Sequence, residues 1–135
     1  MTGVFVDSNV LIDVLAPDPV WESWSTEALR RAADAATLVI NPIVFGELAF
    51  GYPSIERLHA ALDSQAVRRE SIPWAAAFLA GRAFATYRQR GGTRRSPLPD
   101  FYIGAHAAVA GYRLLTRDAR RYRTYFPRLE LIAPS

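Results

Sequence analysis

Residues 4–13 read Val-Phe-Val-Asp-Ser-Asn-Val-Leu-Ile-Asp, and this stretch decides the fold. Its β-branched and aromatic start predicts a short buried strand over residues 3–7. The apolar residues that follow predict a helix over residues 9–15, because the proline-rich segment 17–19 cannot continue it. Asp7 therefore stands at the carboxyl end of a strand, at the point where the chain turns into a helix.

The rest of the chain alternates between strand and helix patterns. Short apolar runs predict strands, while longer segments bounded by capping residues, prolines or glycines predict helices. In chain order these are a helix after residue 20, a strand at 37–40, a helix from Asn41-Pro42, a helix at 53–64, a weak strand at 66–72, a helix at 73–90, a helix from Pro99 to Gly111, a strand at 113–116, a helix at 119–125 and a strand at 129–132. This alternation predicts one α/β domain over residues 1–135, with a mostly parallel sheet of four to five strands flanked by helices.

The composition excludes several classes of protein. Half of the 135 residues are hydrophobic, which supports a folded domain, and there is no cysteine for disulfides, zinc–thiolate sites or thiol nucleophiles. All 16 basic residues are arginine, so the lysine of a Walker A phosphate loop is missing, and no GxGxxG motif marks a dinucleotide site. The most apolar stretch, residues 74–80, is too short to span a membrane, and we expect a cytoplasmic protein.

Four acidic residues occupy places where packing gives no reason for a carboxylate. They lie in or at the end of apolar segments: Asp7, Glu47, Asp100 and Asp118. Two carboxylates about 4 Å apart repel by about 4 kcal/mol at an effective dielectric near 20, so a cluster of four requires protonation or a bound cation. Magnesium or manganese is the natural partner, since cysteine is absent and histidine is scarce.

Each acid also has a simpler interpretation. Asp7, Asp100 and Asp118 could cap helices or complement helix dipoles, and Glu47 could pair with a buried arginine. Asp13 is better explained as a capping or solvated residue than as a metal contact, and His106 as a packed or interface residue than as a catalytic one. The joint pattern of the four acids is more informative than any one of them.

The motifs around these acids resemble those of a known family. Residues 6–13, 41–48, 98–107 and 114–118 are similar, in order and spacing, to the successive motifs of PIN-domain ribonucleases, and most of all to the VapC-type toxins of bacterial toxin–antitoxin pairs. The resemblance covers essentially the whole chain. Gly104, where the family usually has alanine, and the arginine-rich segment before Leu98 depart from the pattern.

The resemblance implies a three-layer PIN-like fold and a Mg²⁺- or Mn²⁺-dependent endoribonuclease that leaves 5′-phosphate and 3′-hydroxyl ends. It implies Asp7 and Asp100 as direct metal ligands, Glu47 as a ligand or a base that orients water, and Asp118 as a peripheral, water-mediated member. Hydrogen bonds from Ser8, Asn9 and Thr116 would hold the carboxylates in place. The implied biology is a toxin that inhibits translation and growth, held by a VapB-like antitoxin and assembled as a homodimer or a toxin–antitoxin hetero-oligomer.

Arginines cluster on both sides of two of the acids. We expect those nearest to Asp100 and Asp118 to bind RNA, namely Arg94, Arg95, Arg117, Arg120 and Arg121, although a solvated helix face would give the same pattern. The aromatic residues Trp21, Trp24, Trp74, Phe78 and Phe84 are either core residues or part of an interface.

Two other functions stay open. One is a PIN-like RNA- or protein-binding module without activity. The other is a phosphoryl-transfer domain with an acidic Mg²⁺ site, which is disfavoured because the chain lacks the lysine and the Asp-x-Asp motif that such families use.

Overall fold

The computed structural model describes residues 3–95 and 98–135. Its elements are β1 (Gly3–Val6), α1 (Ser8–Leu15), α2 (Glu22–Ala35), β2 (Thr37–Ile40), α3 (Pro42–Ala49), α4 (Ile55–Ser64), β3 (Val67–Arg69), α5 (Trp74–Gln89), α6 (Pro99–Ala110), β4 (Arg113–Leu115), α7 (Arg120–Tyr125) and β5 (Leu131–Ile132). Within the described ranges, no helix is long and apolar enough to cross a membrane.

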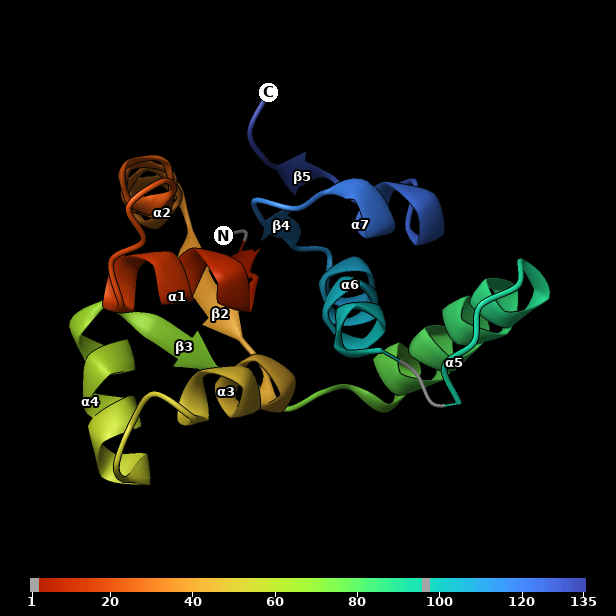
Figure 1. The fold of residues 1–135 in the computed structure, drawn as a ribbon, viewed down its shortest axis with the longest axis horizontal. Helices are drawn as coiled ribbons and strands as arrows, with labels where there is room; N and C mark the ends of the chain where they lie inside the picture. Colours follow the sequence, from red (N-terminus) through yellow and green to blue (C-terminus); the bar gives the residue numbers. More distant parts are fainter. Residues whose placement is uncertain (1–2, 96–97) are drawn as a thin grey trace.

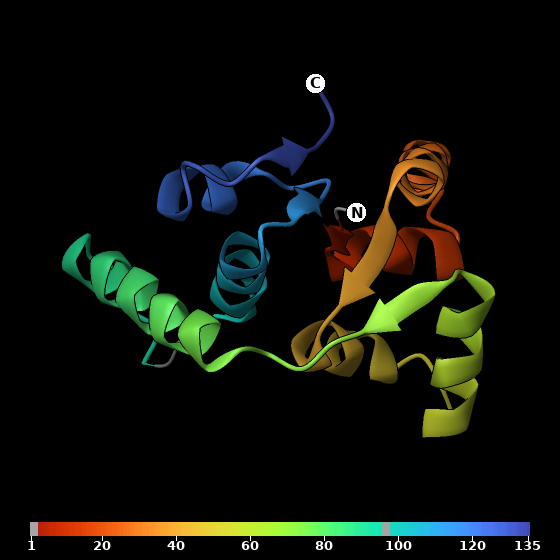
Figure 2. The ribbon, with the colours of Figure 1, turned by 180° about the vertical axis from the view of Figure 1, so that it is seen from behind.

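The strands form one parallel sheet in the order β3-β2-β1-β4-β5. Helices flank this sheet, and the long helix α5 packs on the outer side of α6 (Figures 1 and 2). The predicted α/β fold with a parallel sheet flanked by helices is therefore confirmed. The weak strand predicted at 66–72 is β3, and it is only three residues long.

The strand order places a topological switch beside the central strand. The chain leaves β1 for β2 and β3 on one side, and later returns to add β4 and β5 on the other side. Asp7 directly follows β1, and Thr116 directly follows β4. The carboxyl ends of β1 and β4 thus form the kind of crevice in which open α/β sheets bind ligands.

Local sequence explains where the helices begin and end. The side chain of Asn41 accepts hydrogen bonds from the backbone N–H groups of Ile43 and Val44, and Pro42 fills the first turn of α3. Helix α6 also has a proline in its first turn, and it ends at Gly111, whose φ of +75° is in the left-handed region that favours glycine.

Gly104 on α6, a departure from the family pattern, has a packing reason. A Cβ atom at this position would lie 2.6 Å from ring carbons of Phe126 and 3.1 Å from the Tyr122 ring. The helix therefore passes closer to the segment after β4 than an alanine would allow. This close approach helps to place Tyr122 next to the carboxyl ends of the strands.

Burial differs from the apolar pattern of the sequence in two places. The apolar segment around Glu47 is only partly buried, since Phe50 is 83% exposed, and Gly46 and Ala49 are also exposed. On α5, Trp74 and Phe78 are 92% and 72% exposed, so they do not belong to the core. Apolar composition alone does not distinguish a core face from a face that remains open on the isolated chain. Trp21, Trp24 and Phe84 are half-buried.

Candidate active site

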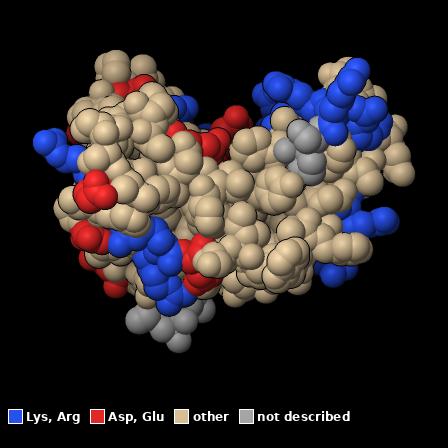
Figure 3. Space-filling model, turned by 90° about the horizontal axis from the view of Figure 1, so that it is seen from below, with Lys and Arg blue, Asp and Glu red and all other residues tan. Residues whose placement is uncertain are grey.

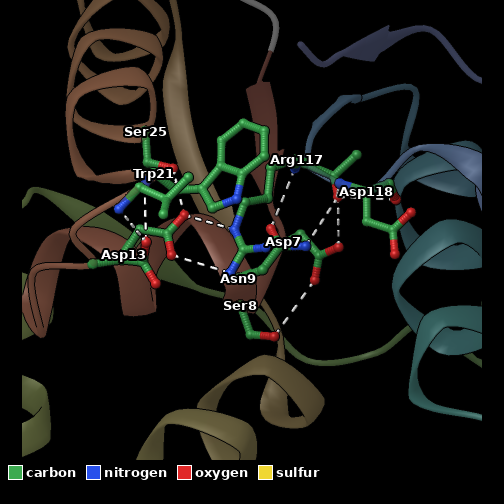
Figure 4. Close-up of polar contacts among 11 residues, drawn as sticks. Asp7, Ser8, Asn9, Asp13, Trp21, Ser25, Arg117 and Asp118 are labelled. Carbon is green, nitrogen blue, oxygen red and sulfur yellow. Dashed lines mark hydrogen bonds and ion pairs between the residues drawn. The ribbon is translucent and has the colours of Figure 1, made fainter.

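Asp7 is the most deeply placed of the four acids. It is 5% exposed, and its backbone N–H donates to the carbonyl oxygen of Leu115 at 2.9 Å, which joins the ends of β1 and β4. Asp7 is the N-cap residue of α1 by position, but its side chain makes no capping hydrogen bond. The carboxylate turns instead into the crevice, where it meets hydroxyl groups (Figure 4).

Three hydroxyl groups surround this carboxylate. Thr116 Oγ1 and Tyr122 Oη each donate to Asp7 Oδ2 at 2.9 Å, and Ser8 Oγ lies 3.5 Å from Oδ1. No arginine pairs with Asp7 in the part of the chain that the structure describes. Burial raises the pKa of Asp7 to about 6, the nearby Asp100 and Glu47 carboxylates add to the rise, and the hydrogen bonds from Thr116 and Tyr122 only partly oppose it.

Ser8 connects Asp7 to the second acid, Glu47 on α3. Its hydroxyl donates to Glu47 Oε1 at 2.9 Å, a shorter contact than its 3.5 Å distance to Asp7. Burial raises the pKa of Glu47, and the Asp100 carboxylate contributes in the same direction. The alternative of a buried ion pair is wrong for Glu47, since no arginine contacts it within the described segments.

Tyr122 connects Asp7 to the third acid, Asp100 in the first turn of α6. Its hydroxyl lies 2.9 Å from Asp7 Oδ2 and 3.4 Å from Asp100 Oδ1, and its single proton favours the nearer carboxylate. Burial raises the pKa of Tyr122 well above its ordinary value, and the two aspartates reinforce this, so the hydroxyl remains a donor.

Asp100 has a cationic partner, and no other member of the set pairs with a cation in the described part of the chain. Arg121 Nη1 lies 3.2 Å from Asp100 Oδ2. The pKa of Asp100 is nevertheless raised, because burial outweighs the attraction of Arg121 and the Asp118 carboxylate adds repulsion. One arginine therefore does not neutralise the local negative charge.

Asp118 lies at the edge of the site. It is exposed, and its backbone N–H donates to Thr116 Oγ1 at 3.1 Å. Its side chain lines a cleft of about 420 Å³ that also contains Asp100, Arg120, Arg121, Thr124 and Tyr125. This placement agrees with the peripheral position that was expected of Asp118.

Asn9 supports the loop after β4. Its amide nitrogen lies 3.4 Å from Thr116 Oγ1, and its amide oxygen accepts from the backbone N–H of Arg117 at 3.4 Å. Asn9 and Ser8 lie beside the Asp7 carboxylate (Figure 4), and Thr116 contacts both Asn9 and Asp7 at the junction of β1 and β4.

Arg117 has a different role from the predicted contact with RNA. Its guanidinium forms two hydrogen bonds to the buried Asp13, at 2.8 and 3.2 Å, and lies 5.4 Å from the centre of the Trp21 ring. Ser25 Oγ completes the shell of Asp13 at 2.7 Å (Figure 4). Asp13 is thus a buried structural residue that ties α1 to α2 and to the loop after β4. The expectation that it is a capping or solvated residue was wrong.

The other arginines leave a basic surface next to the acids. Arg94, Arg95 and Arg120 are exposed, and Arg121 reaches Asp100. Figure 3 shows acidic atoms in a notch of the molecular outline and arginine side chains gathered on the lobe beside it. A polyanion lying across the notch would meet both kinds of charge.

The donor set suits a hard divalent cation that keeps part of its water shell. Among the described residues no three acidic or histidine side chains are close enough to hold a metal ion as they stand. The available donors are oxygens, and the carboxylates of Asp7, Glu47 and Asp100 all have raised pKa values. Mg²⁺ commonly binds through one or two carboxylates plus several waters, so this set of oxygen donors fits such a site.

Sequence reasoning missed Tyr122 as a member of the site. The one available signal was its position as the single aromatic residue within the arginine run Arg120-Arg121-Tyr122-Arg123. A large apolar ring in such a run predicts a buried contact, but it does not reveal that the hydroxyl meets Asp7 and Asp100. The ion pair between Arg121 and Asp100 was also unforeseen.

The crevice, the parallel sheet and the acids define an α/β protein with an acidic site at its strand ends, and comparison with known proteins gives the family. The family model for the PIN domain matches residues 4–127, and the chain belongs to this family. No match was found among curated protein sequences.

Solved structures share the fold over nearly the whole chain. The VapBC2 complex of Rickettsia felis bound to promoter DNA has a chain with 20% identity and a TM-score of 0.73, and VapBC-1 of nontypeable Haemophilus influenzae has 18% identity and a TM-score of 0.72. DNA-bound VapBC of Salmonella typhimurium has 22% identity and a TM-score of 0.72. In each case the alignment covers 98% of both chains.

Proposed function

We propose that this chain is a Mg²⁺- or Mn²⁺-dependent endoribonuclease. The observation that carries the proposal is the linked set of carboxylates: Tyr122 connects Asp7 to Asp100, and Ser8 connects Asp7 to Glu47. Among the described residues, only Arg121 offsets this charge directly. A PIN-domain chain that gathers so much uncompensated negative charge at a switch point is suited to binding a divalent cation.

Each acid has a separate role in this proposal. Asp7 and Asp100 would bind the cation directly, Glu47 would bind it or orient the attacking water, and Asp118 would act through water. When bound, the cation would lower the pKa of a water molecule and offset charge on the phosphate in the transition state. Thr116, Ser8, Asn9 and Tyr122 would keep the carboxylates aimed at the crevice by hydrogen bonds.

The arginines would hold the RNA backbone against this acidic site. Arg120 lines the cleft with Asp100 and Asp118, Arg94 and Arg95 are exposed in the segment before α6, and Arg121 would exchange Asp100 for a phosphate when the cation binds. The expected products carry a 5′-phosphate and a 3′-hydroxyl, as for hydrolysis by a metal-activated water.

We also infer that the nuclease acts as the toxin of a toxin–antitoxin pair in the cytoplasm and inhibits translation and growth when free. The support is the likeness of the whole chain to chains of VapBC complexes. Its partner would then be a VapB-like antitoxin. The toxin would assemble as a homodimer or as a toxin–antitoxin hetero-oligomer. The exposed Trp74 and Phe78 on α5 and Phe50 after α3 support a protein interface.

The test is cleavage of labelled RNA by the purified protein with Mg²⁺, with Mn²⁺ and with chelator. Asp7→Asn and Asp100→Asn should abolish cleavage, whereas Asp34→Asn, a change at an exposed ion pair on α2, should not. Cleavage that persists in chelator would rule out the metal mechanism. RNA binding without any cleavage would instead identify an inert binding module.

A further inference from the structure

A hydrogen-bonded chain outside the acidic set links the two helices that carry Glu47 and Asp100. It consists of Asn41, which caps α3, His106 on α6, and Glu70, which follows β3. Asn41 and His106 are 1% and 0% exposed. Neither the proposed metal site nor the proposed RNA surface uses these groups.

The geometry determines the orientation of the Asn41 amide. Its oxygen accepts from the N–H groups of Ile43 and Val44 at 3.0 and 3.1 Å, and backbone N–H groups are only donors. The amide nitrogen therefore faces His106 Nδ1, at 3.2 Å. Because this nitrogen is also only a donor, His106 Nδ1 must accept.

It follows that the proton of His106 is on Nε2. This nitrogen donates to Glu70 Oε1 at 3.0 Å. Tyr112 Oη donates to Glu70 Oε2 at 2.8 Å, and Arg68 pairs with the same oxygen. Burial raises the pKa of Glu70, but the hydrogen bonds from Tyr112, His106 and Arg68 outweigh it and the net shift is downward, so Glu70 stays an acceptor.

The imidazole has little freedom to rotate. Its ring centre lies 5.1 Å from that of Phe5 on the central strand β1, in a tilted packing. No described buried side-chain nitrogen or oxygen lacks a hydrogen-bond partner. The three side chains are therefore a satisfied, rigid contact between α3, α6 and the end of β3.

We propose that Asn41, His106 and Glu70 form a brace that sets the distance between Glu47 on α3 and Asp100 on α6. Glu47 lies six residues after Asn41, and Asp100 lies six residues before His106. This role rests on the proposed metal-dependent function, and it makes the three side chains positioning residues. They do not touch the substrate.

The length of the helices makes the carboxylates sensitive to this contact. Six helical residues span about 9 Å, so a tilt of about 10° at the brace displaces Glu47 or Asp100 by about 1.5 Å. Metal–ligand distances in proteins vary by only about 0.2 Å. A small loosening at His106 therefore weakens cation binding even though the fold is retained.

The first test concerns the proton on His106 in the wild-type protein without metal. Long-range ¹H–¹⁵N NMR spectra should show a neutral imidazole protonated at Nε2, and the His59→Gln variant assigns the signals of the two histidines. A proton on Nδ1, or an imidazolium at neutral pH, would overturn the brace and leave the proposed nuclease function intact.

The second test measures Mn²⁺ affinity by calorimetry in the absence of RNA. His106→Leu, which removes both bonds, should weaken binding by about 10- to 100-fold, as expected when groups that orient metal ligands are lost. His106→Asn places an oxygen near the former Nδ1 position and restores the bond to Asn41 but not the bond to Glu70, so its affinity should lie between those of wild type and His106→Leu. If both variants bind Mn²⁺ like wild type, the brace does not position the site.

Two further variants separate positioning from general stability. Leu29→Ala truncates a buried side chain on α2 and should lower the melting temperature as much as His106→Leu without changing Mn²⁺ affinity. Asn41→Ser keeps a capping hydroxyl for α3 but has no amide nitrogen to donate to Nδ1, so it should weaken Mn²⁺ binding as His106→Leu does. Normal affinity in Asn41→Ser would overturn the brace. A wild-type protein that neither binds Mn²⁺ nor cleaves RNA would overturn the proposed function and the brace's role with it.

Discussion

Replacing Asp7 by asparagine should make the metal-free protein more stable while it abolishes cleavage. The substitution keeps the shape of the side chain. The asparagine oxygen can accept from Thr116 and Tyr122 where Asp7 Oδ2 does, and its nitrogen can donate toward Ser8 Oγ. The contacts remain and the buried negative charge disappears.

The pKa of Asp7 gives the size and the pH dependence of the effect. Its pKa is raised from 3.8 to about 6 in the folded state, so the folded protein holds the proton at pH values where the unfolded chain has released it. The stability that is fully present below about pH 4 is therefore lost as the pH rises through 6. At 1.36 kcal/mol per unit, the raised pKa of Asp7 lowers the stability of the fold by about 3 kcal/mol at pH 7 and by about 1 kcal/mol at pH 4.5, relative to low pH. The variant removes this cost at both values.

The measurement is urea unfolding of wild type and Asp7→Asn in chelator at pH 7 and pH 4.5. The variant should be more stable by about 3 kcal/mol at pH 7, which corresponds to a melting temperature about 10 °C higher, and the gap should shrink to about 1 kcal/mol at pH 4.5. Saturating Mg²⁺ should stabilise wild type more than the variant. A gap that is absent at pH 7, or equal at both pH values, would refute the argument.

Asp13 is the matched control, because it is also a buried aspartate beside α1. Asp13→Asn removes the anionic partner of Arg117 and should destabilise the protein by about 2 to 4 kcal/mol, the opposite sign to Asp7→Asn. If both variants shifted stability in the same direction, charge compensation would not explain either of them.

Three further predictions concern groups around the carboxylates. Tyr122→Phe removes the hydroxyl between Asp7 and Asp100, so Mn²⁺ affinity measured by calorimetry should fall by about tenfold, and an unchanged affinity would make the hydroxyl dispensable. Arg121→Gln removes the ion pair with Asp100, so the variant should bind Mn²⁺ more tightly and RNA more weakly than wild type. Weaker Mn²⁺ binding would show that Arg121 does not compete with the cation for Asp100. Joint replacement of Arg94 and Arg95 by glutamine should reduce the salt dependence of RNA binding, with a log–log slope smaller by about 1 to 2 in filter-binding assays, and an equal slope would exclude both from the interface.

Local patterns predicted the elements and the location of the acids. The run at residues 4–6 and the capping pair Asn41-Pro42 are signals carried by neighbouring residues, and they placed β1 and α3 correctly. Asp7 was expected at a strand end for the same reason. A carboxylate that directly follows a buried strand lies at the edge of the sheet where the strands end.

The partners of these acids could not be predicted, because they come from distant parts of the chain. Tyr122 lies 115 residues from Asp7, and Arg117 lies 104 residues from Asp13. Nothing in the sequence distinguishes Arg117, which is tied to a buried aspartate, from its neighbour Arg120, which is exposed. Pairings of this kind depend on how the elements pack, and composition and spacing leave them open.

The two buried aspartates of the first motif differ in how their charge is matched within the fold. Asp13 receives two hydrogen bonds from Arg117 and one from Ser25, so its charge is matched within the fold. Within the described residues, the Asp7 carboxylate receives hydrogen bonds only from hydroxyl groups, which orient a carboxylate but leave its charge in place. An uncompensated buried charge destabilises the protein, so Asp7 must either hold a proton or gain a partner from outside the chain. The divalent cation proposed at Asp7 would be that partner, and this is why stability and metal-binding measurements on Asp7 test the proposed function while those on Asp13 test only folding.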